Sequence, residues 1–293
     1  MYDLIIIGLG PAGLNACIYA KRSNLNVFVI ERGMPGGTLH NIKDIENYLG
    51  YEHITGSDLA IKFYKQFKDL NIPHVTEEVE NIINNKDYKE VITNKNKYQA
   101  KSIIIATGRG PLKLGLENEK LPGVSYCTLC DGSLYKDKIV TLYGNGPKNL
   151  EDAIYLSGIA QKVYFVYNQN DLLGPKDLIL KVKASDNIVL MPNEEITEII
   201  GEKILEKVKL KVNYLETNAL FVNNGYGPIT YFVKDLGITD DHGYIIVDNR
   251  QETNIKGIFA CGDNTKKDIY QIITAASEGA SSAINAYKYI KDI

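Results

Sequence analysis

The sequence has few of the features that mark membrane-spanning, secreted or nucleic-acid-binding proteins. No apolar run reaches the roughly 18 residues that cross a bilayer. The opening segment Met1-Tyr2-Asp3-Leu4 lacks the basic start and the cleavage site of a signal peptide. The net charge of -3 provides no basic stripe that would neutralise phosphates. We therefore expect a cytoplasmic protein that binds neither membranes nor nucleic acid.

Cysteine and histidine are also scarce, with four residues of each type. The histidines are scattered along the chain, which predicts no metal site. Cys127 and Cys130 form a CxxC pair, and in a reducing compartment such a pair is more often catalytic or metal-binding than a structural bridge. Cys17 and Cys261 are expected to act as small buried hydrophobic residues.

The 293 residues, of which 44% are hydrophobic, are enough for two packed domains. Near the start, residues 4–7 predict a strand, Gly8-Leu9-Gly10-Pro11-Ala12-Gly13 a tight turn and residues 14–22 a helix. Gly8 permits the turn, Gly10 lets a pyrophosphate approach the backbone, and Gly13 lets the helix pack on the strand. A second strand, residues 26–30, leads to Glu31, whose carboxylate can accept hydrogen bonds from a ribose. This pattern predicts a dinucleotide-binding fold.

A second segment repeats the pattern but replaces the residues that would bind the ligand. Residues 138–143 predict a strand, 144–149 a turn, 150–157 a helix and 162–166 another strand. Asn149 stands where the first turn has Gly13, and we expect its side chain to weaken the packing of helix on strand. Tyr167 stands where the first unit has Glu31, and residues 168–170 include neither a carboxylate nor an arginine. The second unit is expected to keep the fold without its nucleotide.

Cys127 and Cys130 are predicted to form a thiol–disulfide exchange centre. The CxxC spacing lets two sulfur atoms approach closely enough for a disulfide, and a nearby positive dipole or base would lower the pKa of one thiol. The alternatives are an inert pair and half of a zinc site. Zinc would need a second pair of Cys or His ligands, which neither Cys17 in the first helix nor Cys261 at a strand end supplies.

Motifs along nearly the whole chain carry a resemblance to a known family. In order, they are Gly8 to Gly13 with Glu31, Gly36-Gly37-Thr38, Ile45-Glu46-Asn47-Tyr48, Ile105-Ala106-Thr107-Gly108, Cys127-Thr128-Leu129-Cys130-Asp131-Gly132 and Gly257-Ile258-Phe259-Ala260-Cys261-Gly262-Asp263. Together they resemble the low-molecular-weight thioredoxin reductases. The resemblance implies an α/β fold of two tandem Rossmann-like, three-layer ββα domains of the disulfide oxidoreductase type, with FAD as cofactor. It assigns residues 1–110 and 226–293 to an FAD domain and residues 111–225 to an inserted pyridine-nucleotide-like domain that carries the CxxC pair.

The resemblance also implies roles for individual residues. It places Cys130 next to the flavin and makes Cys127 the sulfur that attacks a thioredoxin disulfide. Asp131 would donate or accept a proton, with a helix-capping acid as the alternative. Asp263 would hold the ribityl chain of the flavin. The FAD-binding residues that the motifs imply are Gly8, Gly10, Pro11, Ala12, Gly13, Glu31, Arg32, Gly36, Gly37, Thr38, Asn47, Thr107, Gly108, Gly262, Asp263, Tyr270, Gln271 and Ile272.

Departures from the family pattern concern the electron donor. Members that use NADPH carry an HRRxxxR segment, and here Asn168, Gln169 and Leu173 replace its arginines. Each lost charge-assisted hydrogen bond is typically worth about 1.5–3 kcal/mol, so selection for a 2′-phosphate should be absent. The family also has an Arg-Gln pair after a tyrosine near the flavin, whereas Gln271 follows Tyr270 directly. This pattern is similar to the ferredoxin-dependent flavin thioredoxin reductases.

We therefore expect a homodimeric enzyme whose FAD passes electrons from reduced ferredoxin or flavodoxin to the Cys127/Cys130 disulfide and on to thioredoxin. Lys266 and Lys267 are candidates for a ferredoxin-docking surface, and a solvated loop is the alternative. Three other functions stay open. They are a dithiol oxidase that uses oxygen, a conventional NADPH thioredoxin reductase with atypical nucleotide contacts, and a redox sensor or scaffold without turnover.

Overall fold

The computed structural model describes all 293 residues, which fold into two compact units. The first unit consists of Met1–Gly110 and Gly227–Ile293, and the second of Pro111–Tyr226. The chain passes between them through β7 (Arg109–Pro111) and β16 (Tyr226–Pro228), which pair with each other. The predicted α/β class is confirmed, because each unit packs helices on a largely parallel sheet. None of the helices combines the length and the apolar character needed to cross a bilayer.

The sheet of the first unit is built around an apolar strand, β1. β1 (Tyr2–Ile7) pairs in parallel with β2 on one side and β6 on the other, so that Ile7 lies opposite both Ile30 and Ile105. Leu4 to Ile7 are buried, as expected for a strand that is covered on both faces. The strand order is β3-β2-β1-β6-β5-β4, with β17 also paired to β6; the bounds are β2 (Val27–Glu31), β3 (His74–Thr76), β4 (Val79–Asn84), β5 (Lys89–Thr93), β6 (Lys97–Ile105) and β17 (Ile258–Ala260).

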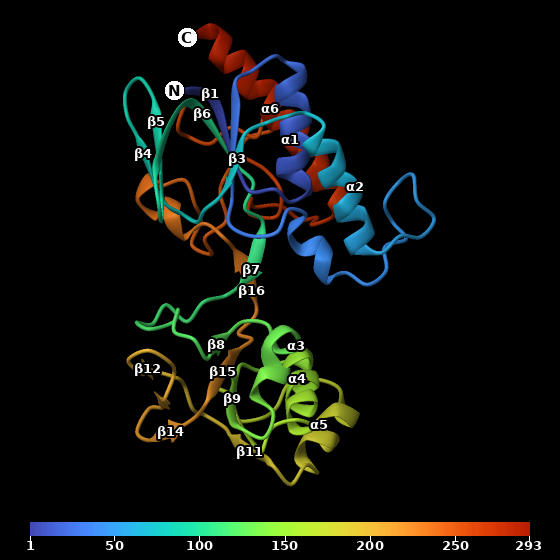
Figure 1. Ribbon diagram of the computed structural model, residues 1–293, viewed down its shortest axis with the longest axis vertical. Coiled ribbons are helices and arrows are strands. Elements are labelled where there is room, and N and C mark those ends of the chain that lie inside the picture. Colours follow the sequence, from blue (N-terminus) through green and yellow to red (C-terminus); the bar gives the residue numbers. More distant parts are fainter. The chain divides into compact units, whose positions relative to one another are not determined.

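Helices α1 (Pro11–Arg22), α2 (Gly56–Lys68) and α6 (Ile272–Asp292) lie on one side of this sheet (Figure 1). Helices α1 and α6 pack closely against each other. A Cβ atom on Gly279 would lie 2.0 Å from the carbonyl oxygen of Ala12, so only glycine permits this approach. The other face of the sheet packs on η3 (Tyr231–Leu236) and on the segment that follows it.

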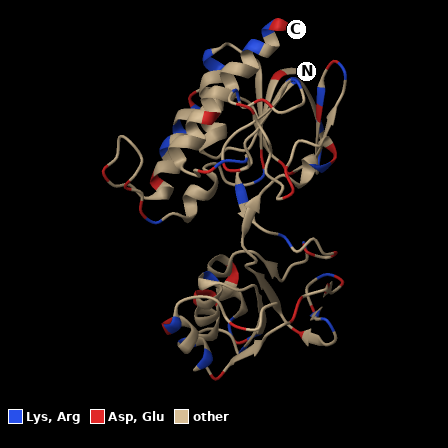
Figure 2. Ribbon diagram, turned by 180° about the vertical axis from the view of Figure 1, so that it is seen from behind, with Lys and Arg blue, Asp and Glu red and all other residues tan.

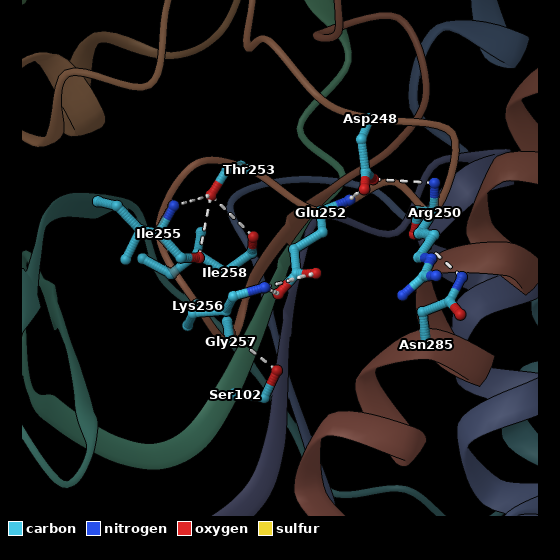
Figure 3. Close-up of polar contacts among 10 residues, drawn as sticks. All are labelled: Ser102, Asp248, Arg250, Glu252, Thr253, Ile255, Lys256, Gly257, Ile258 and Asn285. Carbon is cyan, nitrogen blue, oxygen red and sulfur yellow. Dashed lines mark hydrogen bonds and ion pairs between the residues drawn. The ribbon is translucent and has the colours of Figure 1, made fainter. Parts of the chain in front are cut away.

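A hydrogen-bonded turn fixes the position of β17 (Figure 3). The Asp248 carboxylate accepts a hydrogen bond from the Glu252 backbone N–H at 2.9 Å, and the Thr253 hydroxyl donates to the first carbonyl of β17 at 2.9 Å. From β6, Ser102 Oγ donates to the Gly257 carbonyl at 2.9 Å. These bonds hold β17 beside β6, so the chain leaves both strands at the same edge of the sheet.

The second unit has a five-stranded parallel sheet in the order β11-β10-β9-β15-β8. Helices cover one face, and the antiparallel sheet β12-β13-β14 packs on the other. Acidic and basic residues are interspersed over both units (Figure 2). The bounds are β8 (Val124–Ser125), α3 (Thr128–Asp131), η2 (Gly132–Tyr135), β9 (Ile139–Tyr143), α4 (Pro147–Ser157), β10 (Lys162–Val166), α5 (Lys176–Lys183), β11 (Ile188–Met191), β12 (Glu198–Ile200), β13 (Lys207–Lys209), β14 (Tyr214–Glu216) and β15 (Ala219–Val222).

The contact between α1 and α6 gives a stability prediction. Gly279→Ala should lower the free energy of unfolding by about 1–3 kcal/mol, because the added methyl group overlaps the Ala12 carbonyl oxygen. Thermal unfolding followed by circular dichroism measures the change. Gly158→Ala is the matched control, since a Cβ there meets its nearest atom at an ordinary 3.5 Å. Equal melting temperatures for the two variants would contradict the prediction.

Candidate functional site

The loops after four parallel strands of the first unit meet at one edge of its sheet. They follow β1, β2, β6 and β17, which all run in the same direction. Since the carboxyl ends of parallel strands lie at one edge, residues far apart in the sequence come together there. Gly8, Ala106 and Cys261 begin three of these loops, and Glu31 is the last residue of β2; all four lie next to or within the predicted FAD motifs.

The first glycine turn is tightly packed on one side and open on the other. Gly8 has a φ of +102°, and a Cβ atom there would lie 2.4 Å from the Ala106 carbonyl oxygen. A Cβ atom on Gly13 would lie 1.9 Å from the Gly8 carbonyl oxygen, so both positions require glycine. By contrast, nothing lies within 4 Å of a Cβ atom built on Gly10. Gly10 therefore presents open backbone at the start of α1, where backbone N–H groups can bind a phosphate.

Glu31 closes the turn from the second strand. Its Oε2 accepts a hydrogen bond from the Leu9 N–H at 2.6 Å, and its Oε1 accepts one from the Gly33 N–H at 2.8 Å. The neighbouring predicted residue, Arg32, lies near the hydroxyl of Tyr231. Burial raises the pKa of Tyr231, and the charge of Arg32 opposes this increase.

The loop after β2 returns to the first turn. The Gly36 N–H donates to the Leu9 carbonyl at 2.7 Å, and a Cβ atom on Gly37 would lie 3.3 Å from Gly10 Cα. Thr38 follows in the short helix η1, which spans Gly37–Asn41. The structure therefore brings the first two predicted FAD motifs into direct contact.

Two further predicted residues are joined by their side chains. Asn47 Nδ2 donates to Gln271 Oε1 at 3.1 Å. Gln271 precedes Ile272, the first residue of α6, and its backbone N–H donates to Thr274 Oγ1 at 3.2 Å. The start of α6 is thereby connected to the loop that carries Asn47.

The loop after β6 contributes both a bound side chain and open backbone. The Thr107 hydroxyl donates to the Ile229 carbonyl at 2.7 Å and accepts from Asn264 Nδ2 at 3.2 Å. Gly108 has a φ of +65°, and nothing lies within 4 Å of a Cβ atom built there. Thr107 thus joins the two chain segments of the first unit, while Gly108 leaves its backbone open.

Asp263 lies among charged and aromatic side chains that the sequence did not reveal. Burial raises the pKa of its carboxyl group, and the charges of Lys267 and Arg109 partly offset the increase. The guanidinium carbon of Arg109 lies 5.2 Å from the ring centre of Tyr270 and 6.0 Å from that of Tyr244. Tyr270 is therefore part of an aromatic–cation group near Asp263. Only the fold shows this, because Arg109, Tyr244 and Tyr270 lie far apart in the sequence.

The expected docking role needs correction for Lys267, one of two adjacent lysines. The Lys267 side chain is only 13% exposed and is paired with Glu278, which also accepts from the Gly262 N–H at 2.8 Å. Lys266 is 66% exposed and lies 3.5 Å from an Asp240 oxygen. Lys267 is therefore neither a solvated loop residue nor a free surface charge, and it supports the Gly262 loop from inside.

The turn of the second unit carries a buried side chain, that of Asn149, where the first turn has Gly13. Asn149 is 3% exposed, and its Nδ2 donates to the Asn223 carbonyl at 3.0 Å and weakly to the Tyr143 carbonyl at 3.5 Å. A Cβ atom on Gly146, the counterpart of Gly10, would lie 3.7 Å from Asn149 Oδ1. The expected loss of packing is not found, because α4 still packs on β9 and β10. The amide instead occupies space that is open in the first unit.

The segment after β10 is tied to this turn. Asn145 Nδ2 donates to Gln169 Oε1 and to the Asp171 carbonyl, both at 2.9 Å, and its Oδ1 accepts from the Leu173 N–H at 2.9 Å. Tyr167, at the position that corresponds to Glu31, is 4% exposed. The second turn is thus closed on the side where the first presents a carboxylate.

Cys127 and Cys130 form a disulfide in the second unit, with their Cα atoms 5.3 Å apart. Cys127 directly precedes α3, and Asp131 is the last residue of this helix. Ser125 Oγ donates to Asp131 Oδ2 at 2.7 Å and accepts from the Cys127 N–H at 3.1 Å. The Asp131 side chain makes no capping hydrogen bond to α3 or to η2, which argues against the helix-capping alternative. No motif singles out Ser125, whose hydroxyl bridges Cys127 and Asp131.

The other two cysteines are fully buried and reduced. Burial raises the pKa of both thiols, that of Cys261 to about 12. A thiol in such surroundings is a poor nucleophile. The described residues contain no cluster of three or more His, Cys, Asp or Glu side chains that could hold a metal ion.

Comparison with known proteins connects this geometry to a family. The family described as pyridine nucleotide-disulphide oxidoreductase matches residues 2–279 of this chain. The chain is similar to thioredoxin reductase from Listeria monocytogenes, with 35% identity over 100% of this chain and 95% of that protein. It is also similar to the structure of Lactococcus lactis thioredoxin reductase, with 36% identity, a TM-score of 0.69 and 100% of both chains covered. A ferredoxin-flavin thioredoxin reductase from Clostridium acetobutylicum has 34% identity and a TM-score of 0.60, covering 100% of this chain and 99% of that one.

The chain therefore belongs to the pyridine nucleotide-disulphide oxidoreductase family of flavoprotein enzymes. Within that family it belongs to the thioredoxin reductases, and it binds FAD. The first unit fits this cofactor, because the backbone at Gly10 and Gly108 is open where a dinucleotide would approach. In the second unit the corresponding Gly146 has the Asn149 side chain as a neighbour.

Removal of the Glu31 carboxylate should weaken FAD binding. Glu31→Ala deprives the Leu9 and Gly33 N–H groups of their acceptor and removes the expected ribose partner, so the affinity for FAD should fall at least about tenfold. Titration of FAD into the apoprotein, followed by flavin fluorescence, measures this change. Glu216→Ala, at an exposed carboxylate of the second unit, is the control. Equal affinities for both variants would contradict the assignment of Glu31.

Proposed function

We propose that this enzyme takes electrons from a one-electron carrier, reduced ferredoxin or flavodoxin, and passes them through FAD and the Cys127/Cys130 disulfide to thioredoxin. The observation that supports this donor is the turn of the second unit, where the buried Asn149 side chain replaces the third glycine of the first turn and is hydrogen-bonded to the Asn223 carbonyl. Similarity to the Clostridium acetobutylicum ferredoxin-flavin enzyme agrees with the proposal. We further propose a cytoplasmic homodimer, on the basis of the sequence resemblance.

NADPH binding at the second turn would require several hydrogen bonds to break. A pyrophosphate needs backbone N–H groups at the start of α4, and there the Asn149 side chain lies beside Gly146, whereas no side chain lies beside Gly10 in the first unit. Asn145 holds Gln169 and Leu173 against the turn from the other side. The segment also supplies no arginine for a 2′-phosphate. A hydride donor would therefore lack the anchors that orient its nicotinamide.

A protein carrier of single electrons needs only close approach. When bound, FAD can accept electrons one at a time and deliver them as a pair, which is the chemistry that it supplies here. The reduction potential of a plant-type ferredoxin, about -400 mV, lies below that of thioredoxin, about -270 mV, so the overall electron transfer is downhill. Each thioredoxin disulfide then consumes two reduced carriers and two protons.

The residues around the disulfide would handle the protons and the exchange. In this proposal Cys127 attacks the thioredoxin disulfide and Cys130 receives the electrons, as the resemblance implies. The Asp131 carboxylate would accept or donate the proton of a cysteine thiol. Its hydrogen bond to Ser125, which also binds the Cys127 N–H, would hold it in one orientation relative to the redox loop.

Anaerobic mixing tests the donor. Reduced ferredoxin should bleach the flavin and support the reduction of thioredoxin, whereas NADPH at equal reducing equivalents should do neither within the same time. Absorbance at the flavin band and a thiol assay of thioredoxin measure the two steps. A Cys127→Ser, Cys130→Ser double variant is the control, because its flavin should still bleach while thioredoxin stays oxidised.

Two outcomes would overturn this proposal. Rapid bleaching and thioredoxin turnover with NADPH, but not with ferredoxin, would identify a conventional reductase. Oxygen uptake driven by a small dithiol, without thioredoxin reduction, would identify a dithiol oxidase.

A further inference from the structure

A buried carboxylate lies against the helix that carries the redox pair. Asp152, in α4, is 2% exposed, and its Oδ2 accepts from Thr128 Oγ1 at 3.1 Å. Thr128 is the residue after Cys127 and the first residue of α3. A negative charge is therefore held in the protein interior one side chain away from the disulfide loop.

Two other groups fix this carboxylate. Asn223 Nδ2 donates to the same Oδ2 at 3.1 Å, and Lys148 Nζ lies 2.9 Å from Oδ1. Burial lowers the pKa of Lys148, but its hydrogen bond and ion pair with Asp152 outweigh this and leave the pKa raised. The Lys148 side chain is itself 52% exposed, so its charge is partly screened by water.

The carboxylate is also connected to the filled nucleotide turn. The Asn223 carbonyl accepts from Asn149 Nδ2 at 3.0 Å, and the Asn223 N–H donates to the Tyr143 carbonyl at 2.9 Å. Asn149 thus donates a hydrogen bond to Asn223, and Asn223 donates one to Asp152. The side chain that closes the turn is part of the support beneath the redox loop.

We propose that Asp152 is a positioning residue that acts through Thr128 to fix the redox loop, and that its charge keeps the Cys127/Cys130 pair strongly reducing. Lys148 moderates this charge. The proposal rests on the redox role of the cysteine pair and is independent of the electron donor. Asn149 and Asn223 complete the support.

The sign follows from the chemistry of the disulfide. Reduction breaks the S–S bond, takes up two electrons and yields two thiols with two protons, or one thiol and one thiolate with a single proton. Stabilising a thiolate stabilises the reduced form and makes the pair less reducing. A nearby negative charge disfavours the thiolate, so Asp152 raises the thiol pKa and makes the potential more negative.

Other titratable groups surround the same helix and must be separated from Asp152. Asp131 belongs to α3 itself and is held by Ser125. Glu151 has a carboxylate like that of Asp152, but its side chain is 58% exposed and lies 3.7 Å from Lys148. The titratable groups on the elements around α3 are Asp131, Tyr135, Lys148, Glu151, Asp152 and Tyr155.

Two charge variants with opposite expected effects test the proposal. Asp152→Asn keeps the shape and an oxygen for Thr128, but it removes the charge. In the full-length FAD-loaded protein, the pH midpoint for iodoacetamide alkylation of the reduced pair should fall by roughly one pH unit. The disulfide potential, measured against dithiothreitol redox buffers, should become less negative. Lys148→Gln should move both quantities the other way.

Glu151→Gln is the matched control, and it should change neither quantity, because Glu151 pairs only with Lys148 at 3.7 Å, whereas Lys148 contacts the Asp152 carboxylate directly at 2.9 Å. Thr128→Val should increase the alkylation rate at every pH by loosening the loop, and Thr128→Ser should restore the original rate. Unchanged midpoints in both Asp152→Asn and Lys148→Gln, or shifts of the same sign, would overturn the proposal. If Asp152→Asn fails to fold, Lys148→Gln still tests the proposal, because the Lys148 side chain is 52% exposed and its replacement should not disturb the fold. A pair that dithiothreitol cannot reduce in the unaltered protein would instead overturn the redox function.

Discussion

The pairing of β6 with three other strands is the constraint on which the first unit depends. One side of β6 pairs with β1; the other pairs with β5 along its first half and with β17 along its last residues. The N-terminal glycine turn, the Thr107-Gly108 loop and the Gly262-Asp263 loop therefore emerge side by side. The close approach of α6 to α1 at Gly279 completes this arrangement. The strand order thus brings residues from both ends of the chain to one cofactor site.

The second unit repeats the strand–turn–helix pattern and uses it differently. In the first turn the space beside Gly10 is empty, and in the second the Asn149 amide lies beside Gly146. A buried amide must be hydrogen-bonded, and the carbonyl groups of Asn223 and Tyr143 satisfy it. The same interactions that close the turn lead through Asn223 to Asp152 and the redox loop. The proposed loss of the nucleotide site and the proposed support of the disulfide thus involve one set of residues.

The sequence predicted the α/β fold correctly, because glycine spacing and apolar strands are local signals. It also indicated that Asn149 and Tyr167 do not suit a nucleotide. It failed for properties that depend on long-range contacts. Asn149 was expected to disturb packing, but carbonyl groups from two other strands accept its hydrogen bonds. Lys267 was considered a surface charge, but α6 supplies Glu278 as its partner.

The side chains missed at the candidate sites have the same explanation. Arg109 contacts tyrosines that are more than a hundred residues away in the sequence, and Asp152 contacts Thr128 and Asn223 only because α4, α3 and β15 are adjacent in the fold. No spacing or motif marks such pairs. Ser125 lies near Asp131 in sequence, yet its hydrogen bond depends on the conformation of the loop before α3.

The most direct test of the account is the affinity of the oxidised protein for NADPH. Isothermal titration under conditions that leave the flavin bound should show no saturable binding, with any Kd weaker than about 1 mM, because Asn149 replaces the third glycine of the second turn and the segment after β10 lacks arginine anchors. Saturable binding with a Kd in the micromolar range would contradict the central claim that this turn no longer accepts a nucleotide.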